Sequence, residues 1–134
     1  MGELTPSENE WLIMEVLWNR GEAMTAAEII EDLKGVLNIN KNTIRVMINR
    51  LLGKSVIDYH VDAHDARVYH YYPLKSKEEC LSLKSERFVN NYFGGKASLA
   101  VASFLRSASL SKEELDTLKS LVEQLEEEKE TDGG

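Results

Sequence analysis

The chain has 134 residues, of which 43% are hydrophobic and 29% charged, and its formal net charge is −7, which is ordinary for a soluble globular protein of one or two small domains. It lacks both an apolar run near the roughly 18 residues of a membrane span and a basic-then-apolar signal pattern at its start. Its single cysteine, Cys80, excludes an internal disulfide and a cysteine-based metal site, so we expect a cytoplasmic protein.

Two helices are predicted in the first 35 residues. Residues 5–8 (TPSE) fit a capping box with proline at the first helical position, and this helix should run to about Asn19, before Gly21. Residues 25–28 (TAAE) form a second capping box, which predicts a short helix ending at Gly35. Apolar residues at helical spacing support the first helix: Trp11, Met14, Leu17 and Trp18.

A third helix is predicted from a cap at Asn40 to about Gly53, within a stretch, 41–55 (KNTIRVMINRLLGKS), that has four basic residues and no acid. One side of this helix is apolar: Ile44, Met47, Ile48, Leu51 and Leu52. The opposite side gathers Asn42, Thr43, Arg45, Val46, Asn49 and Arg50, with Lys41 and Lys54 as flanking charges. In the major groove Arg pairs with guanine, Asn with adenine, and Thr or Val packs on a thymine methyl.

An ordinary amphipathic surface helix would show the same two sides. The DNA interpretation is favoured because the second helix ends only a few residues before the third, which is the spacing of a helix-turn-helix.

A β-hairpin is predicted after the third helix. Residues 56–61 (VIDYHV) and 67–72 (RVYHYY) are β-prone, and the short polar loop 62–66 separates them. Three helices followed by a hairpin form a winged helix-turn-helix, with Arg67 and the loop near the DNA backbone or the adjoining minor groove. The predicted fold class is therefore mainly α with a small β-hairpin wing, and residues 1–75 form the DNA-binding domain.

Three further helices are predicted from residue 76, and they define a helical dimerisation domain over 76–130, followed by a disordered tail over 131–134. Together they have more apolar surface than one small lobe can bury, so a second copy of the chain is the expected partner. The residues expected in the interface are Leu81, Phe88, Val89, Tyr92, Phe93, Leu99, Phe104, Leu115, Leu118, Val122 and Leu125.

Other kinds of site have little support in the sequence. His60, His64 and His70 with Asp62 and Asp65 match no metal-ligand spacing, and solvated loop residues are the simpler interpretation, so we expect no metal. No nucleophile-elbow pattern or glycine-rich phosphate loop is present, so we expect neither an enzyme nor a cofactor. The alternative function is a winged-helix module whose third helix binds an acidic protein instead of DNA.

Segments along nearly the whole chain resemble the penicillinase-repressor (BlaI/MecI/CopY) family. LTPSENEWLIMEVLW resembles the family's opening helix, and NTIRVMINRLLGKSVIDY resembles its recognition helix and first wing strand. ARVYHYYPLKSKEE resembles the second wing strand and the entry to the dimerisation helices. FVNNYFGGKASLAVASFL and LSKEELDTLKSLVEQLEE resemble the C-terminal region.

The resemblance implies a homodimeric repressor on a palindromic operator of double-stranded DNA. Thr43, Arg45, Val46, Asn49 and Arg50 match the family's recognition-helix positions. The resemblance further implies release by an antibiotic- or stress-linked signal, with a sensor-linked protease as a partner. The candidate cleavage site in the corresponding segment is the Ser103–Phe104 pair.

Overall fold

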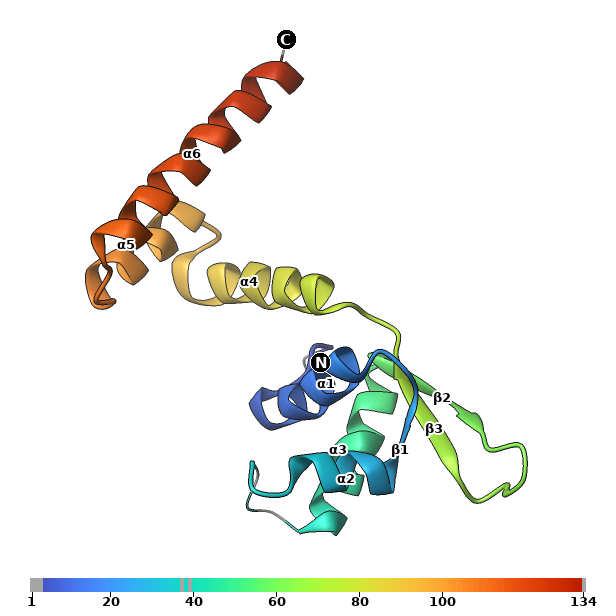
Figure 1. The fold of residues 1–134 in the computed structure, drawn as a ribbon. Coiled ribbons are helices and arrows are strands. Elements are labelled where there is room, and N and C mark those ends of the chain that lie inside the picture. The colour runs from blue at the N-terminus through green and yellow to red at the C-terminus, as the bar shows by residue number, and fades with distance from the viewer. Residues whose placement is uncertain (1–3, 37, 39, 134) are drawn as a thin grey trace. The chain divides into compact units, whose positions relative to one another are not determined.

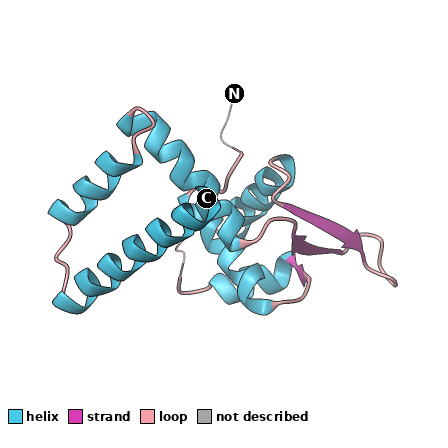
Figure 2. Ribbon diagram, turned by 90° about the horizontal axis from the view of Figure 1, so that it is seen from above, coloured by secondary structure: helices cyan, strands magenta, loops and turns pink. Residues whose placement is uncertain are grey.

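The computed structural model describes residues 4–36, 38 and 40–133, and these contain six helices and three strands (Figures 1 and 2). The chain divides into two compact units, Met1–Phe88 and Val89–Gly134. The N-terminal unit holds α1, α2 and α3, the three strands and most of α4, and the C-terminal unit holds the end of α4 with α5 and α6. Within the described residues, no helix has the length and apolar character needed to cross a membrane.

Three capped helices begin the N-terminal unit: α1 (Glu8–Arg20), α2 (Ala26–Leu33) and α3 (Lys41–Gly53). The predicted caps of α2 and α3 are confirmed, because Thr25 Oγ1 accepts from Glu28 N at 3.2 Å and Asn40 Oδ1 accepts from Thr43 N at 2.9 Å. Each bond satisfies an amide that has no partner within its own helix.

The predicted cap of α1 is wrong by two residues. Ser7, not Thr5, is the N-cap, and its hydroxyl accepts from Glu10 N at 3.3 Å while Glu10 Oε1 accepts from Ser7 N at 3.1 Å. Two overlapping stretches, 5–8 and 7–10, have the same spacing of hydroxyl and carboxylate, and the later one forms the box. Pro6 therefore lies before the cap and not inside the helix.

The three strands form one antiparallel sheet in the order β1-β3-β2 (Figure 1). The predicted hairpin is confirmed as β2 (Ile57–Val61) and β3 (Tyr69–Pro73), although Arg67 and Val68 lie in the turn and not in the strand. A further strand, β1 (Met24–Thr25), pairs with β3 and was not predicted from the sequence. Helices α1 to α3 and the β2–β3 hairpin that follows them make the winged helix-turn-helix that the sequence predicts.

One hydrophobic core holds the N-terminal unit together, and it includes the first turns of α4 (Lys77–Phe93). Cys80 is fully buried in that core, and Lys77 Nζ lies 2.8 Å from Glu15 Oε1 on α1. Just before α4, Trp18 Nε1 donates to the Lys75 carbonyl oxygen at 2.9 Å. The compact N-terminal unit thus extends past residue 75, the limit given to the DNA-binding domain from the sequence, and ends at Phe88.

The C-terminal unit is helical and has almost no interior. Gly94 and Gly95, both with positive φ, end α4, and α5 (Ala97–Ser107) and α6 (Lys112–Gly133) follow. Among its described residues only Ala100 is buried. The tail expected to be disordered, 131–134, is helical through residue 133, and residue 134 lies outside the described residues.

Candidate nucleic-acid interface

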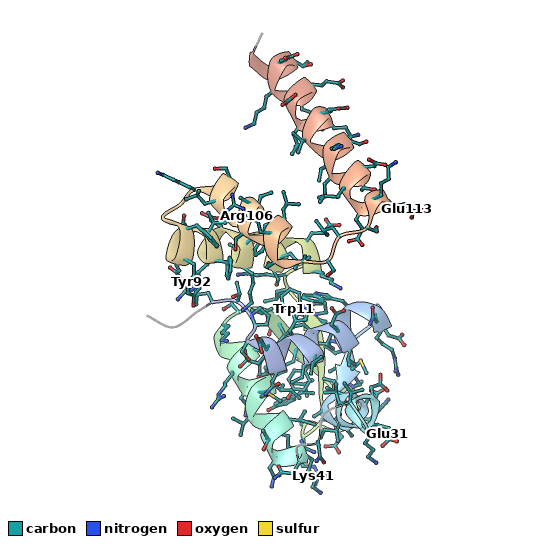
Figure 3. The ribbon with its side chains drawn as sticks, turned by 90° about the vertical axis from the view of Figure 1, so that its left-hand side faces the viewer. Trp11, Glu31, Lys41, Tyr92, Arg106 and Glu113 are labelled. Atoms are coloured by element: carbon teal, nitrogen blue, oxygen red, sulfur yellow. The ribbon has the colours of Figure 1, made fainter. Side chains whose placement is uncertain are left out.

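The side of α3 that faces away from the core presents the side chains expected from the sequence. Four apolar residues anchor the opposite side, with exposed fractions of 4% or less: Ile44, Met47, Ile48 and Leu51. Seven predicted DNA contacts are all exposed: Lys41, Asn42, Thr43, Arg45, Val46, Asn49 and Arg50. Lys41 begins the helix and is labelled in Figure 3. We call these seven residues the α3 outer face.

The α3 outer face combines positive charge with groups that can distinguish bases. No acidic residue occurs anywhere in α3, so no carboxylate on the helix opposes a phosphate. Arg45 and Arg50 offer bidentate donors, and Asn42 and Asn49 offer a donor and an acceptor each. Val46, 48% exposed, offers an apolar contact of the kind that packs on a thymine methyl.

Lys54, which was predicted from the sequence to be a DNA contact, lies apart from these residues. Its ammonium is 2.6 Å from Glu10 Oε1 and 3.1 Å from the Thr5 carbonyl oxygen, and its side chain is only 21% exposed. Burial raises the pKa of Glu10, but hydrogen bonds from Lys54 and Ser7 outweigh burial and hold that pKa below its ordinary value. The pair therefore ties the C-terminal end of α3 to the start of α1.

Arg67 lies in the hairpin turn with a side chain that is 90% exposed. Its Nε is 3.1 Å from Asp65 Oδ1 and its Nη2 is 3.3 Å from Asp65 Oδ2. The hydrogen bonds from Arg67 lower the pKa of the Asp65 carboxyl. A phosphate would thus meet a guanidinium whose charge is already balanced by a neighbouring carboxylate.

The histidines considered as metal ligands are part of the hairpin structure. His60 and His70 are opposite each other in the register, with ring centroids 5.1 Å apart, and His70 Nε2 is 2.8 Å from Asp62 Oδ1. Asp62 also accepts from the amides of His64 and Asp65, which shapes the turn. No group of three or more His, Cys, Asp or Glu side chains in the described part of the chain is arranged to hold a metal ion.

The other face of the hairpin is aromatic, and no role was predicted for it from the sequence. Tyr59 and Tyr69 stack with ring centroids 4.3 Å apart, and each is 38% exposed. The alternation of residues in 56–61 and 67–72 places these tyrosines on one face, which is the signal that could have identified them.

The apolar side chains predicted for dimerisation are largely exposed within one chain. Val89 and Phe93 are half-buried. The others are between 36% and 73% exposed: Leu81, Phe88, Tyr92, Leu99, Phe104, Leu115, Leu118, Val122 and Leu125. Tyr92, the most exposed of them, is labelled in Figure 3 at the end of α4. Exposed apolar side chains that recur along a helix, as on α6, are typical of a side that another protein covers.

The candidate cleavage bond lies inside a regular helix. Ser103 and Phe104 are both in α5, and Ser107 Oγ donates to the carbonyl oxygen of Ser103 at 2.9 Å. That carbonyl belongs to the Ser103–Phe104 peptide bond. A protease needs an extended segment, so α5 would have to open locally before cleavage.

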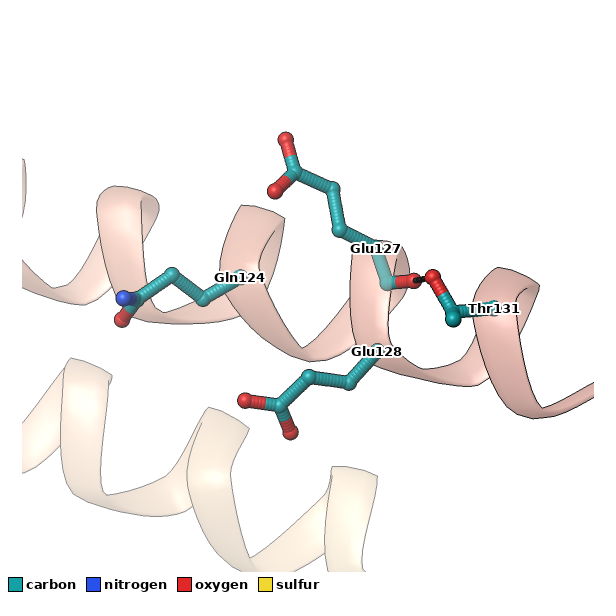
Figure 4. Close-up of a pocket in the computed structure, with 4 residues that line it drawn as sticks. All are labelled: Gln124, Glu127, Glu128 and Thr131. Atoms are coloured by element: carbon teal, nitrogen blue, oxygen red, sulfur yellow. Dashed lines mark hydrogen bonds between the residues drawn. The ribbon is translucent and has the colours of Figure 1, made fainter.

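A shallow hollow on α6 offers little to a ligand. Gln124, Glu127, Glu128 and Thr131 line it, and the Thr131 hydroxyl donates to the Glu127 carbonyl oxygen at 3.0 Å (Figure 4). Two carboxylates on one exposed helix, with no cationic side chain among the described lining residues, do not indicate a binding site.

The order of elements in the N-terminal unit and the exposed polar side of α3 define a winged helix-turn-helix protein of the DNA-binding class. The sequence profile of the penicillinase repressor family matches residues 6–124, which is most of the chain. The chain belongs to the penicillinase repressor family. It is accordingly a transcriptional repressor that binds DNA, and not an enzyme.

Two relatives match over similar lengths. The penicillinase repressor of Bacillus licheniformis is 29% identical over 118 residues, covering 88% of this chain and 89% of that protein. The methicillin resistance regulatory protein MecI of Staphylococcus aureus (strain N315) is 28% identical over 116 residues, covering 87% and 91%. The solution structure of the DNA-binding domain of the repressor BlaI aligns with a TM-score of 0.48 and 24% identity, over 59% of this chain and 93% of that one.

Proposed function

We propose that two copies of this chain bind one palindromic operator in the cytoplasm, each with the α3 outer face in the major groove. The observation that carries the proposal is the composition of that face, in which two arginines, two asparagines, a lysine, a threonine and a valine are exposed and no acid is present. Phosphate contacts would position the helix, and base contacts would select the sequence.

Dimerisation through the C-terminal helices is the second part of the proposal. It is supported by the shortage of interior in the unit that starts at Val89, where α6 leaves Leu115, Leu118, Val122 and Leu125 between 36% and 54% exposed. These four residues recur at helical spacing along one side of α6. A second copy would cover them and link two reading helices, as a two-fold symmetric operator requires.

Release from the operator by an antibiotic- or stress-linked signal is the third part. The candidate route is a sensor-linked protease that cuts between Ser103 and Phe104. Such a cut would separate α6 from the N-terminal unit and leave the α3 outer face intact. Because the bond lies within α5, we expect cleavage to depend on local opening of that helix.

The test is the salt dependence of binding to a duplex that the wild-type chain selects from random sequences. Each neutralised phosphate should contribute about −0.9 to the slope of log affinity against log salt concentration. The wild-type slope should therefore be steep. Arg45→Gln should make the salt slope shallower, by about one for each phosphate contact that the variant loses. Lys129→Gln, near the end of α6, is the control and should leave the slope unchanged.

A flat salt response of the wild-type chain, with no enriched duplex, would contradict DNA reading. Salt-resistant capture of an acidic protein under the same conditions would instead favour the alternative in which α3 binds a protein.

A further inference from the structure

The stacked tyrosines of the wing form a defined surface. In the register Tyr59 is opposite Tyr71 and Val61 is opposite Tyr69, so Tyr59 and Tyr69 are diagonal neighbours on one face. Their rings are 4.3 Å apart between centroids and tilted by only 23°, and each residue is 38% exposed. In the described part of the chain neither phenol hydroxyl donates to or accepts from another protein group.

This face is the one that joins the core at the base of the hairpin. Ile57 and Tyr71, on the same face, are 2% and 8% exposed and belong to the core that also contains Ile44 and Met47 of α3. Farther along, the hairpin projects past the helices of the N-terminal unit (Figure 1), and Tyr59, Val61 and Tyr69 become exposed. We call the exposed part of this hairpin face, formed by Tyr59, Val61 and Tyr69, the tyrosine face. It continues outward from the buried part of the hairpin against which α3 packs.

The charge of Arg45 reaches this face. Burial and the neighbouring phenols of Tyr69 and Tyr59 raise the pKa of Tyr71, while the Arg45 guanidinium opposes that rise. The packing agrees with this, because Ile44 and Met47, the core residues on either side of Arg45 and Val46 in α3, share the core with Tyr71 of the same hairpin face. A duplex whose groove receives Arg45 would bring its flanking sugar-phosphate strand toward Tyr59 and Tyr69.

The hairpin has little free positive charge with which to hold that strand. Arg67 is paired with Asp65, and His70 lies 2.8 Å from Asp62. The exposed phenols are uncharged donors, and tyrosine hydroxyls are among the groups that bind phosphate oxygens in protein–DNA interfaces. Their ring faces can also pack on deoxyribose.

We propose that Tyr59 and Tyr69 form a neutral contact surface for the sugar-phosphate backbone that flanks the site read by α3. This proposal rests on the proposed function and adds a second, uncharged contact to it. Because the phenols displace no counterions, they contribute affinity without adding to the salt slope. The wing then positions the duplex, and α3 supplies both the charge and the base contacts.

The experiment compares Tyr59→Phe, Tyr69→Phe and the double variant with Tyr72→Phe, a matched control on the opposite face of the same hairpin. Phenylalanine keeps the ring stack, so thermal unfolding should be close to wild type in all four variants. The probe is the duplex that the wild-type chain selects from random sequences. Removal of each hydroxyl that bonds to a phosphate should weaken binding between about twofold and tenfold. The log–log salt lines should stay parallel to wild type, and Tyr72→Phe should bind as wild type does.

Phosphate ethylation locates the contact independently. Ethylation of phosphates flanking the selected site should interfere with wild-type binding, and this interference should disappear in the Tyr59→Phe, Tyr69→Phe double variant. Wild-type affinity in that variant, or an equal loss in Tyr72→Phe, overturns this proposal alone. Failure of the wild-type chain to bind any duplex overturns the proposed function as well.

Discussion

At the scale of single residues, Glu10 shows how a capping residue also holds the recognition helix in place. Its carboxylate completes the capping box of α1 and accepts from Lys54 at 2.6 Å across 44 positions of sequence. Glu10→Gln keeps most of the side-chain shape but leaves the partly enclosed Lys54 ammonium without its counter-charge. We expect a loss of about 1–3 kcal/mol in the free energy of unfolding, measured by urea denaturation, with the exposed Glu8→Gln as a control.

The same pair predicts a dependence of stability on pH. The folded-state pKa of Glu10 lies below its unfolded value of about 4.3. Its contribution to the free energy of unfolding is therefore complete above that pH and is lost as the pH falls through the folded-state pKa. The difference between wild type and Glu10→Gln should be large at neutral pH and shrink in acid. A difference that is constant from neutral to acidic pH would contradict this role of the ion pair.

The residues of the α3 outer face should differ in what their loss does to specificity. Arg50→Ala and Asn49→Ala should each cost roughly 1–3 kcal/mol in binding and relax the preference at one base position, if these residues contact bases. Lys54→Ala should chiefly lower stability, because its ammonium bonds to Glu10 and Thr5. Selection of random duplexes by each variant checks this, and equal, sequence-independent losses in the two α3 variants would count against direct readout.

At the scale of elements, the helices and the hairpin could be predicted because their signals are local. The caps at Thr25 and Asn40 and the 3.6-residue period of α3 lie within a few residues of each other, so the exposed side of α3 followed from the sequence. β1 could not be predicted in this way, since a two-residue strand exists only through its pairing with β3.

The position of Lys54 shows the same limit for the site. The sequence shows its charge at the end of α3, but not the carboxylate of Glu10, which only the packing of α1 against α3 brings within reach. The tyrosine pair of the wing shows a related limit: the alternation of residues assigns each tyrosine to one face of its own strand, but only the register of the hairpin brings the rings of Tyr59 and Tyr69 together.

The docking of α4 yields a prediction about fragments. A fragment 1–75 lacks Cys80, which fills part of the core, and Lys77, which pairs with Glu15. A fragment 1–88 keeps both and should be more stable by roughly 1–2 kcal/mol, the scale of burying one small apolar side chain. Urea denaturation of the two fragments measures the difference. Equal stability would mean that the start of α4 adds nothing to the N-terminal unit.

At the scale of the whole molecule, we expect the exposed apolar helices of two chains to pair and so to join their two DNA-binding N-terminal units. Linking them makes the second DNA contact intramolecular, so operator affinity can exceed that of one unit by roughly 10²–10⁴. Sedimentation should then show the full chain as a dimer and the fragment 1–88 as a monomer, and the fragment should bind a half-site weakly. Undiminished operator affinity of the fragment would contradict the role of dimerisation.

The proposed function depends above all on two paired chains reading a two-fold symmetric DNA site, and the decisive experiment is selection from a pool of random duplexes by the full-length protein. We expect repeated rounds to enrich an inverted repeat with two equivalent half-sites, one for each α3 outer face. Recovery of no preferred sequence, or of a single half-site without its inverted copy, would show that the paired chains do not read DNA in this way.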